Sequence, residues 1–265
     1  NSFKRCLSNL IDNGFSYGKK VEIFSEKTMN RLLILILTLF ISNYAFAQIS
    51  TDRPDQTESS LVLPKGTIQI ESGFVSRKNE LIFPNTLFRI GVSKKFEFRI
   101  NTNYIFKNNE NENEISNFSD LEIGTKIQIY NSETSKTSIA FLTHLSIPSA
   151  NEYYSNNTTG LLSRLLISHE LNNNFDLGYN IGYDKFKDEE GAIVYTVALG
   201  KGINNWGIYC ELYGNISDSQ SDLYFDGGLV YLLKDNLQLD VSYGAGINNT
   251  SNYFSAGVSW AFTLF

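Results

Sequence analysis

Apolar and polar side chains alternate along twelve stretches of about ten residues between positions 66 and 265. In the clearest stretch, Leu237, Leu239 and Val241 share one face, and Gln238 and Asp240 share the other. Side chains alternate between the two faces of a strand, so one face can meet lipid while the other lines a polar lumen. The pattern predicts an all-β fold, a membrane-spanning antiparallel up-and-down β-barrel of about 12 strands.

The predicted strands cover residues 66–77, 81–93, 96–106, 118–130, 137–147, 159–169, 175–186, 192–202, 206–216, 223–233, 237–247 and 253–265. A soluble β-sandwich would show the same alternation, so the loops and the export signals must distinguish the two folds. An even number of strands lets both ends of a barrel lie on its periplasmic side.

The connections between these strands are of two kinds. Tight turns at 94–95, 172–174, 203–205 and 234–236 carry Asn, Asp and Lys, and Asn and Asp tolerate the positive φ of short hairpins. Several alternate connections are longer and polar, notably 107–117, 148–157 and 187–191. Short turns at one rim and long loops at the other are typical of an outer-membrane barrel.

Residues 29–47 carry the features of a secretory signal peptide. Arg31 precedes an apolar run over 32–41, and Ala45-Phe46-Ala47 forms a small-x-small cleavage site. The run is shorter than the roughly 20 residues of a spanning helix, which disfavours an anchor. We expect cleavage before Gln48 and localisation in the bacterial outer membrane. Residues 1–28 precede the only Met and are expected to be an upstream extension absent from the product.

Residues 48–65, ahead of the barrel at 66–265, are polar and contain Pro54 and Pro64. They reach the first strand from the periplasmic side, either as an arm outside the barrel or as a plug inside it. Nothing in their pattern indicates packing, so the sequence predicts a periplasmic N-terminal arm.

Charge excludes one class of partner. The first 47 residues carry six of the 22 Lys and Arg and three of the 28 Asp and Glu, which leaves 16 basic against 25 acidic side chains. An exported acidic chain disfavours nucleic-acid binding. Without Cys6, Cys210 has no partner for an internal disulfide, and its place beside Ile208 and Leu212 on the apolar face favours a small lipid-facing side chain.

Charged residues and one histidine on the polar strand faces are the candidate pore lining: Glu71, Arg89, Glu97, Arg99, Asp120, Glu122, Lys126, His144, Arg164, Asp176, Asp184, Glu211, Asp226 and Asp240. Placing Arg or Lys on the lipid face at the midplane costs about 2–4 kcal/mol. The position of these charges on the inward faces of the predicted strands therefore supports a barrel. The charges either orient polar solutes or pair with one another and fill the lumen. Twelve strands lie between filled eight-stranded and open sixteen-stranded barrels, which leaves both states possible.

The last strand is rich in aromatic side chains. Val258, Trp260 and Phe262 share its outward face, and the chain ends at Phe265. We expect this strand to be the signal that the barrel-assembly machinery recognises, with outer-membrane lipid as the surrounding partner. The alternation along this strand places Phe262, rather than the terminal Phe265, on the outward face.

Several blocks resemble a known family. Residues 51–58 (TDRPDQTE), 63–66 (LPKG) and 68–74 (IQIESGF) are similar to the start of outer-membrane transporter-like proteins of Bacteroidetes, a family named for phenol degradation by the meta pathway. Residues 88–99, 119–126, 144–148 and 238–240 are similar to its later segments, although Ser149-Ala150 replaces the family's Thr-Gly. The resemblance implies passive passage of small solutes, with aromatic compounds among them.

Two other functions are weighed against a channel. Outer-membrane phospholipases also have twelve strands, but only His144 and His169 are available here, and neither has a second His at metal-ligand spacing. A structural or binding barrel without an open pore is the other alternative; the run 108–114 (NNENENE) lacks calcium-loop spacing. We therefore expect a small-molecule channel with no catalytic residues, metal or cofactor.

Overall fold

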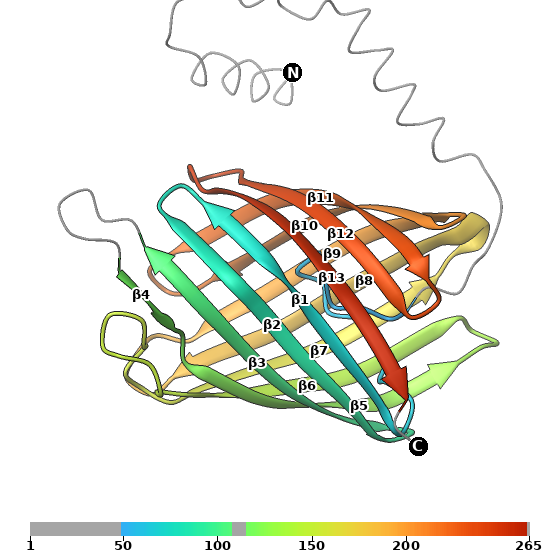
Figure 1. Cartoon of the computed structure of the whole chain (residues 1–265), viewed down its shortest axis with the longest axis horizontal. Helices are drawn as coiled ribbons and strands as arrows, with labels where there is room; N and C mark the ends of the chain where they lie inside the picture. The colour runs from blue at the N-terminus through green and yellow to red at the C-terminus, as the bar shows by residue number, and fades with distance from the viewer. Residues whose placement is uncertain (1–48, 108–114, 264–265) are drawn as a thin grey trace, which may run out of the picture. The chain divides into compact units, whose positions relative to one another are not determined.

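The strands form one closed, tilted sheet (Figure 1). The computed structural model describes residues 49–107 and 115–263. The elements are β1 (Thr67–Arg77), β2 (Glu80–Ser93), β3 (Phe96–Lys107), β4 (Ile115–Phe118), β5 (Leu121–Ser132), β6 (Thr137–Ile147), β7 (Gly160–Glu170), η1 (Asn172–Asn174), β8 (Phe175–Phe186), β9 (Ala192–Ile203), β10 (Trp206–Ile216), β11 (Ser221–Lys234), β12 (Leu237–Gly246) and β13 (Asn252–Thr263).

Strands pair antiparallel with their neighbours along the chain, except that β4 and β5 both pair with β3 and not with each other. Strand β1 pairs with β13 over its whole length. Strands β4 and β5 lie one after the other along β3, so they fill a single position in the wall. The predicted twelve-stranded up-and-down barrel is confirmed. The predicted strand 118–130 is instead interrupted between Phe118 and Leu121.

Burial along the strands is the reverse of that in a soluble protein. On β12, Leu239 and Val241 are 43% and 40% exposed on the outer face, whereas Gln238 and Asp240 are 2% and 3% exposed on the inner face. Water cannot account for an apolar exterior around a charged interior, but lipid can. This distribution excludes the soluble sandwich. The part of the chain that the structure describes holds no helix long and apolar enough to cross a membrane.

The two rims differ as expected of an outer-membrane barrel. One rim carries the tight turns β2–β3, β7–β8, β9–β10 and β11–β12, and β13 ends there. The other carries the longer connections β6–β7 and β8–β9. We call these the periplasmic and outer rims, because short turns face the periplasm in such barrels.

Asp120 was predicted to line the lumen, and the structure corrects this. It lies between β4 and β5, where its carboxylate accepts hydrogen bonds from the backbone N–H groups of Ser149 (3.0 Å), Ala150 (3.1 Å) and Asn156 (2.9 Å) and from the Ser155 hydroxyl (2.9 Å). Burial raises the pKa of Asp120, but these four hydrogen bonds outweigh that effect and hold the pKa below its usual value. The carboxylate fastens the outer loop over residues 148–157.

Replacing Asp120 with Ala is expected to free this loop. Tyr153 is already 69% exposed, so chymotrypsin should cleave after it faster in the variant at pH 7. The pKa of Asp120 is lowered in the folded protein. Its hydrogen bonds to the loop are therefore fully formed above the ordinary carboxyl pKa of about 4 and are lost only at lower pH. Hydrogen exchange of residues 148–157 should thus be independent of this group above that pH. Asp188→Ala, in another outer loop, is the control. Equal cleavage rates in the wild type, Asp120→Ala and Asp188→Ala would contradict the role of Asp120 in holding this loop.

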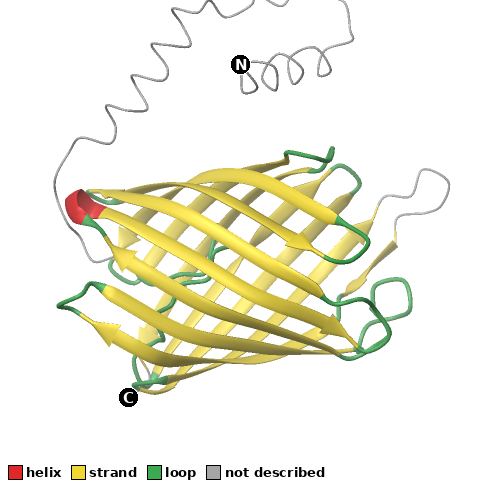
Figure 2. Ribbon diagram, turned by 180° about the vertical axis from the view of Figure 1, so that it is seen from behind, coloured by secondary structure: helices red, strands yellow, loops and turns green. Residues whose placement is uncertain are grey.

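The segment from residue 49 to residue 66 lies inside the barrel, where it is seen as a loop within the strands (Figure 2). Leu63 and Ser60 are buried, and Gly66 N donates a hydrogen bond to Gly91 O at the periplasmic rim (2.8 Å). The prediction of a periplasmic arm is therefore wrong for these residues. We call residues 49–66 the inward segment. The predicted signal peptide 29–47 and extension 1–28 lie outside the described residues.

Candidate functional site: a divided lumen

The inward segment is anchored at Asp52 by cations from three barrel strands. The Asp52 carboxylate contacts Arg99 Nη1 (2.6 Å), Lys126 Nζ (3.0 Å) and Arg89 Nη1 (3.2 Å). All four side chains are almost completely buried. A buried carboxylate is stable only when it is paired and hydrogen-bonded, which these contacts and the Ser59 N–H (2.8 Å) achieve.

Arg89 links the barrel wall to the inward segment. Its guanidinium binds Glu97 Oε1 (2.7 Å) and Glu71 Oε1 (2.9 Å) on neighbouring strands and donates to Ser50 O (2.8 Å). The two carboxylates in turn accept from the segment's backbone, Glu71 from Asp52 N (2.9 Å) and Glu97 from Leu63 N (2.9 Å). The charged residues predicted to line the pore are thus paired with one another here. Residues of the inward segment, which was expected to lie outside the lumen, complete this network.

The turn of the inward segment reaches the middle of the barrel. Arg53 donates to Asn85 Oδ1 (2.7 Å) and Ser255 Oγ (2.9 Å), and it forms an ion pair with Asp240 (3.3 Å). Gly257 makes room for it, since a Cβ there would lie 2.6 Å from Arg53 Nε. This close approach explains a glycine in the inner wall.

The opposite wall holds the far side of the segment. Gln56 N donates to Glu211 Oε2 (2.7 Å), and Thr57 Oγ1 donates to Thr196 Oγ1 (2.7 Å). Nearer the periplasmic rim, the hydroxyls of Ser60 and Ser168 are hydrogen-bonded (2.8 Å). The segment is therefore attached on several sides rather than through one strand.

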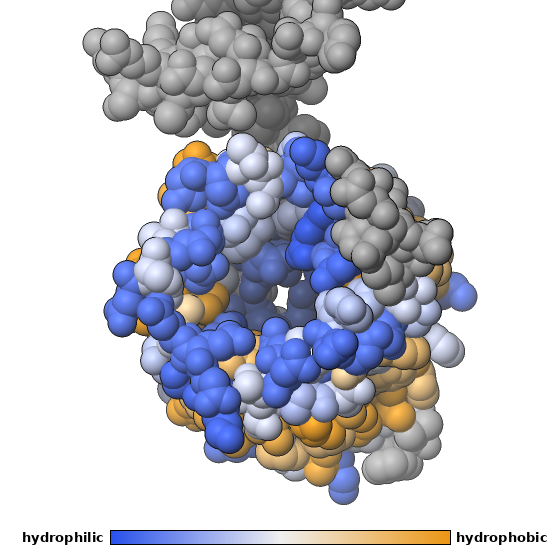
Figure 3. All heavy atoms as spheres, turned by 90° about the vertical axis from the view of Figure 1, so that its left-hand side faces the viewer, coloured by the Kyte–Doolittle hydropathy of each residue, from blue (hydrophilic) through white to orange (hydrophobic). Residues whose placement is uncertain are grey.

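Two cavities of similar size lie on either side of the inward segment. The outer cavity, of about 760 Å³, has residues 52–56 and Glu58 of the segment among its lining. The periplasmic cavity has a volume of about 780 Å³. It is lined by the two ends of the inward segment, including Leu61 and Val62, and by Lys94 and Lys95 of the β2–β3 turn. Figure 3 shows a hydrophilic, hollowed mouth with a narrow opening at its centre.

The wall of the outer cavity carries a second group of predicted residues. Arg164 pairs with Asp184, whose Oδ2 lies 2.9 Å from Arg164 Nη2, and both side chains keep some exposure. Glu122 accepts from Asn101 Nδ2 (3.0 Å). His144 Nδ1 lies 3.9 Å from Glu122 Oε2. Of these residues, the lining of the cavity above the segment includes Asn101, Glu122, His144 and Arg164.

The remaining predicted residues divide between the wall and the rim. Asp226 is buried and accepts a hydrogen bond from the Tyr253 hydroxyl, and the ring of Tyr213 stacks on that of Tyr224 at 5.0 Å beside it. These aromatic side chains border the outer cavity. Asp176 lies at the start of β8 near the periplasmic rim, exposed and away from both cavities.

Sequence reasoning missed the residues of the inward segment that complete the site, above all Asp52, Arg53, Thr57 and Ser60. Their pattern is neither strand-like nor helical, so periodicity could not place them. The available signal was the concentration of charges and hydroxyls in residues 51–58, which is also the first block of the family resemblance.

The two histidines lie in different parts of the barrel and have different contacts. His169 contacts the Thr137 hydroxyl (2.9 Å) and the Tyr179 hydroxyl (3.0 Å) near the periplasmic rim. His144 Nε2 is buried and has no hydrogen-bond partner among the described residues. Within 49–107 and 115–263, no three His, Cys, Asp or Glu side chains gather in a way that would hold a metal ion.

The predicted assembly residues lie on the last strand. Val258 and Trp260 are exposed on β13, and the ring of Phe262 lies 4.8 Å from that of Trp260. Phe265 lies outside the described residues. Cys210 is exposed on β10.

Comparison with solved structures finds the same fold in outer-membrane channels. KdgM porin and NanC porin each share 12% identity with this chain at a TM-score of 0.55, covering 73% of it and 99% and 98% of their own chains. An outer-membrane channel from Pseudomonas putida F1 shares 9% identity at a TM-score of 0.57, covering 77% of this chain and 98% of its own. A search of curated protein sequences finds no match.

The sequence itself matches one family over residues 51–264, which include the inward segment from Thr51 and nearly all of the barrel. This match confirms the family expected from the sequence blocks. The chain is an outer-membrane β-barrel that belongs to the family described as "Putative MetA-pathway of phenol degradation".

Proposed function

We propose that this protein is an outer-membrane channel through which small solutes diffuse passively, and that the inward segment sets its open cross-section. The supporting observation is the pair of cavities, of about 760 and 780 Å³, that the segment separates within one closed barrel. Each is large enough for a small organic solute. Diffusion along the solute gradient needs no cofactor, and charges at the narrow point would govern selectivity.

Similarity supports this proposal in two ways. The solved neighbours are porins and channels of the same fold, and one of them is KdgM in complex with oligogalacturonate. The family description names phenol degradation, which favours aromatic solutes for this chain. An origin in Bacteroidetes and recognition of β13 by the barrel-assembly machinery stay predictions.

Single-channel recording in planar bilayers tests the proposal. The wild-type protein should give stable conductance steps. Arg164→Gln removes a positive charge from the outer cavity and leaves Asp184 unpaired, and Arg99→Gln removes a positive charge beside Asp52, so both should shift selectivity towards cations. Lys78→Gln, an exposed side chain in the β1–β2 turn, is the control and should change selectivity less.

A folded barrel without conductance would contradict an open channel. It would favour either a structural or binding barrel, because the inward segment would then act as a permanent seal, or the phospholipase alternative.

A further inference from the structure

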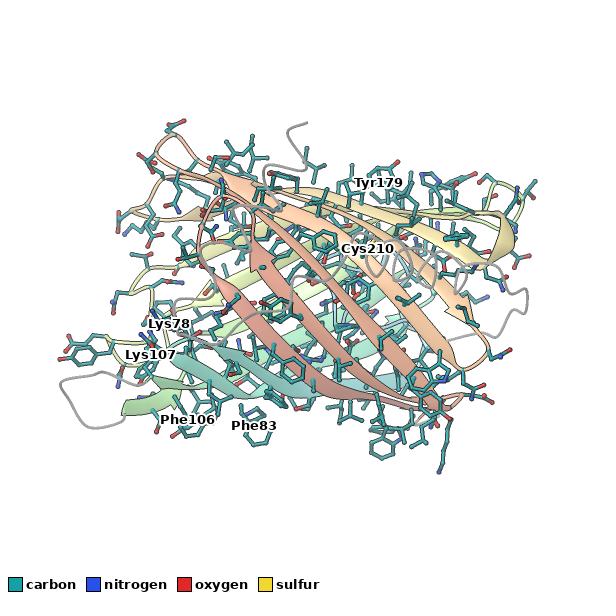
Figure 4. All side chains as sticks on the ribbon, turned by 90° about the horizontal axis from the view of Figure 1, so that it is seen from above. Lys78, Phe83, Phe106, Lys107, Tyr179 and Cys210 are labelled. Carbon is teal, nitrogen blue, oxygen red and sulfur yellow. The ribbon has the colours of Figure 1, made fainter. Side chains whose placement is uncertain are left out.

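Two inward carboxylates lie directly opposite each other on neighbouring strands. Glu211 of β10 and Asp226 of β11 are paired in register and are 1% and 0% exposed. Cys210, the preceding residue on β10, is exposed on the other face of the strand (Figure 4). No ion pair in the described part of the chain includes either carboxylate. Like charges directly opposite each other destabilise a sheet, and a buried charge is costly unless it is paired.

Elsewhere in the lumen, inward carboxylates are neutralised by Arg or Lys. Such ion pairs hold Asp52, Glu71, Glu97, Asp184 and Asp240. Asp55 of the inward segment instead adds a third negative charge beside Glu211 and Asp226, since its neighbour Gln56 donates to Glu211 and the charges interact. We call Asp55, Glu211 and Asp226 the acidic group. Asp55 lines the outer cavity, so a solute there can reach this group.

Buried oxygen atoms beside the acidic group have no hydrogen-bond partner among the described residues. Asp226 accepts from the Tyr253 hydroxyl through Oδ2, but its Oδ1 has no partner, and neither has Oγ of Ser242, which is 3% exposed. Ser242 and Tyr209 meet over Gly228, where a Cβ would lie 3.0 Å from Ser242 Cβ and 2.6 Å from Tyr209 Cε1. The Tyr209 hydroxyl also has no partner. Buried polar atoms are nearly always hydrogen-bonded, so these oxygens are available to a further group.

Tyrosine rings lie between the acidic group and the outer cavity. Tyr213, Tyr224 and Tyr253, which we call the tyrosine wall, line the cavity. Tyr213 and Tyr224 are opposite each other on β10 and β11, and their rings are stacked with an angle of 12° between their planes. Tyr253 packs over Gly244, where a Cβ would lie 2.2 Å from Tyr253 Cε1. Because that position is a glycine, the ring can lie against the wall instead of across the lumen.

An aromatic lining beside unpaired carboxylates suits an organic cation. Tyrosine faces attract ammonium groups, and the attraction is stronger where water is excluded. Calcium and magnesium ions select carboxylate, carbonyl and water oxygens instead, so the rings favour an organic cation.

We propose that the tyrosine wall and the acidic group together form a binding site for a small organic cation that carries an alkylammonium group. The inference deepens the proposed channel function, on which the role of the site rests. It adds organic cations to the aromatic solutes favoured above. The site lies in the outer cavity, on the wall opposite the paired arginines, and would hold such a solute before it passes the inward segment.

Binding of tetramethylammonium to the folded protein in detergent tests this site. tert-Butanol is the matched neutral probe, because it has a similar size and shape but no charge. The methyl signal of each probe in a nuclear magnetic resonance titration measures its binding without requiring passage through the channel. We expect the wild-type protein to bind tetramethylammonium more tightly than tert-butanol.

Two substitutions test the two parts of the site. Asp226→Asn removes a charge but keeps an oxygen for the Tyr253 hydroxyl, and should weaken tetramethylammonium binding on the order of tenfold. Tyr224→Leu removes one ring and should weaken it several-fold. The controls are Asp218→Asn, in the turn that joins the same two strands, and Tyr243→Leu, on the outer face of β12. Neither control should change the binding of tetramethylammonium.

Equal binding of the two probes, or tetramethylammonium binding that Asp226→Asn and Tyr224→Leu leave unchanged, would overturn the site. The first result would indicate that protons neutralise the acidic group. Heat-modifiable migration on gels checks folding, and Asp226→Asn decides alone if Tyr224→Leu does not fold. Conductance is recorded on the same proteins. Binding without conductance would retain the site and reject the open channel, whereas conductance without binding would retain the channel and reject the site.

Discussion

A disulfide made by Thr57→Cys and Thr196→Cys is expected to hold the channel at its lowest conductance until a reductant is added. The two hydroxyls are 2.7 Å apart and join the turn of the inward segment to β9. Facing side chains this close bring their Cα atoms near the separation that a disulfide needs. If the segment moves to admit solutes, the bond prevents that movement. Single-channel recording before and after reduction measures the effect.

The matched control is the pair Ser72→Cys and Thr86→Cys. Its hydroxyls are 2.8 Å apart and join β1 to β2 without contacting the inward segment. Both pairs belong in a Cys210→Ala background, so that no third thiol competes. A conductance that reduction leaves unchanged in the Thr57 and Thr196 variant would show that the segment is static and that solutes pass beside it.

Replacing Arg89 with Met is expected to destabilise the barrel by about 3–5 kcal/mol, because removing one partner of a buried ion pair leaves uncompensated charge. Arg89 is completely buried and pairs with Glu71 (2.9 Å) and Glu97 (2.7 Å), which would keep their charges in the interior. The inward segment would also lose its link to the wall at Ser50 O. Denaturant unfolding of the protein in lipid vesicles measures the change.

Arg77→Met provides the comparison, because Arg77 forms an exposed ion pair with Glu80 (2.8 Å) that is expected to contribute about 0–1 kcal/mol. Replacing Glu71 and Glu97 with Gln in the Arg89→Met protein should recover part of the lost stability. Equal effects at Arg89 and Arg77 would indicate that water reaches the cluster and screens its charges.

The fold could be predicted because its evidence is local. In β12, the polarity of a side chain predicts which face of the barrel wall it occupies. The outward position of Leu239 and the inward position of Asp240 can therefore be predicted without knowing which residues lie next to them. The same pattern recurs from strand to strand, and loop lengths then distinguish the rims. The split of one strand into β4 and β5 escaped prediction because it depends on Asp120 binding the loop at 148–157, which is remote in sequence.

The candidate site was only partly predictable for a related reason. Arg89, Arg99 and Lys126 were recognised as inward charges, but their partner Asp52 lies in a segment with no periodicity. Its burial depends on cations from three strands meeting at one point. Sequence patterns can show that a charge faces inward, but not which charge it meets.

Alternation of side chains along the chain was thus sufficient to predict the number of strands and the polarity of their two faces, since these follow from the two-residue period of a strand. Together with the loop lengths and the export signal, it predicted a barrel. Only the closed structure decided that residues 49–66 enter the lumen, that the charges there pair across strands, and that Asp55 lies beside Glu211. These features arise from contacts between residues far apart in sequence, whose free energy depends on how closely the folded wall brings them together.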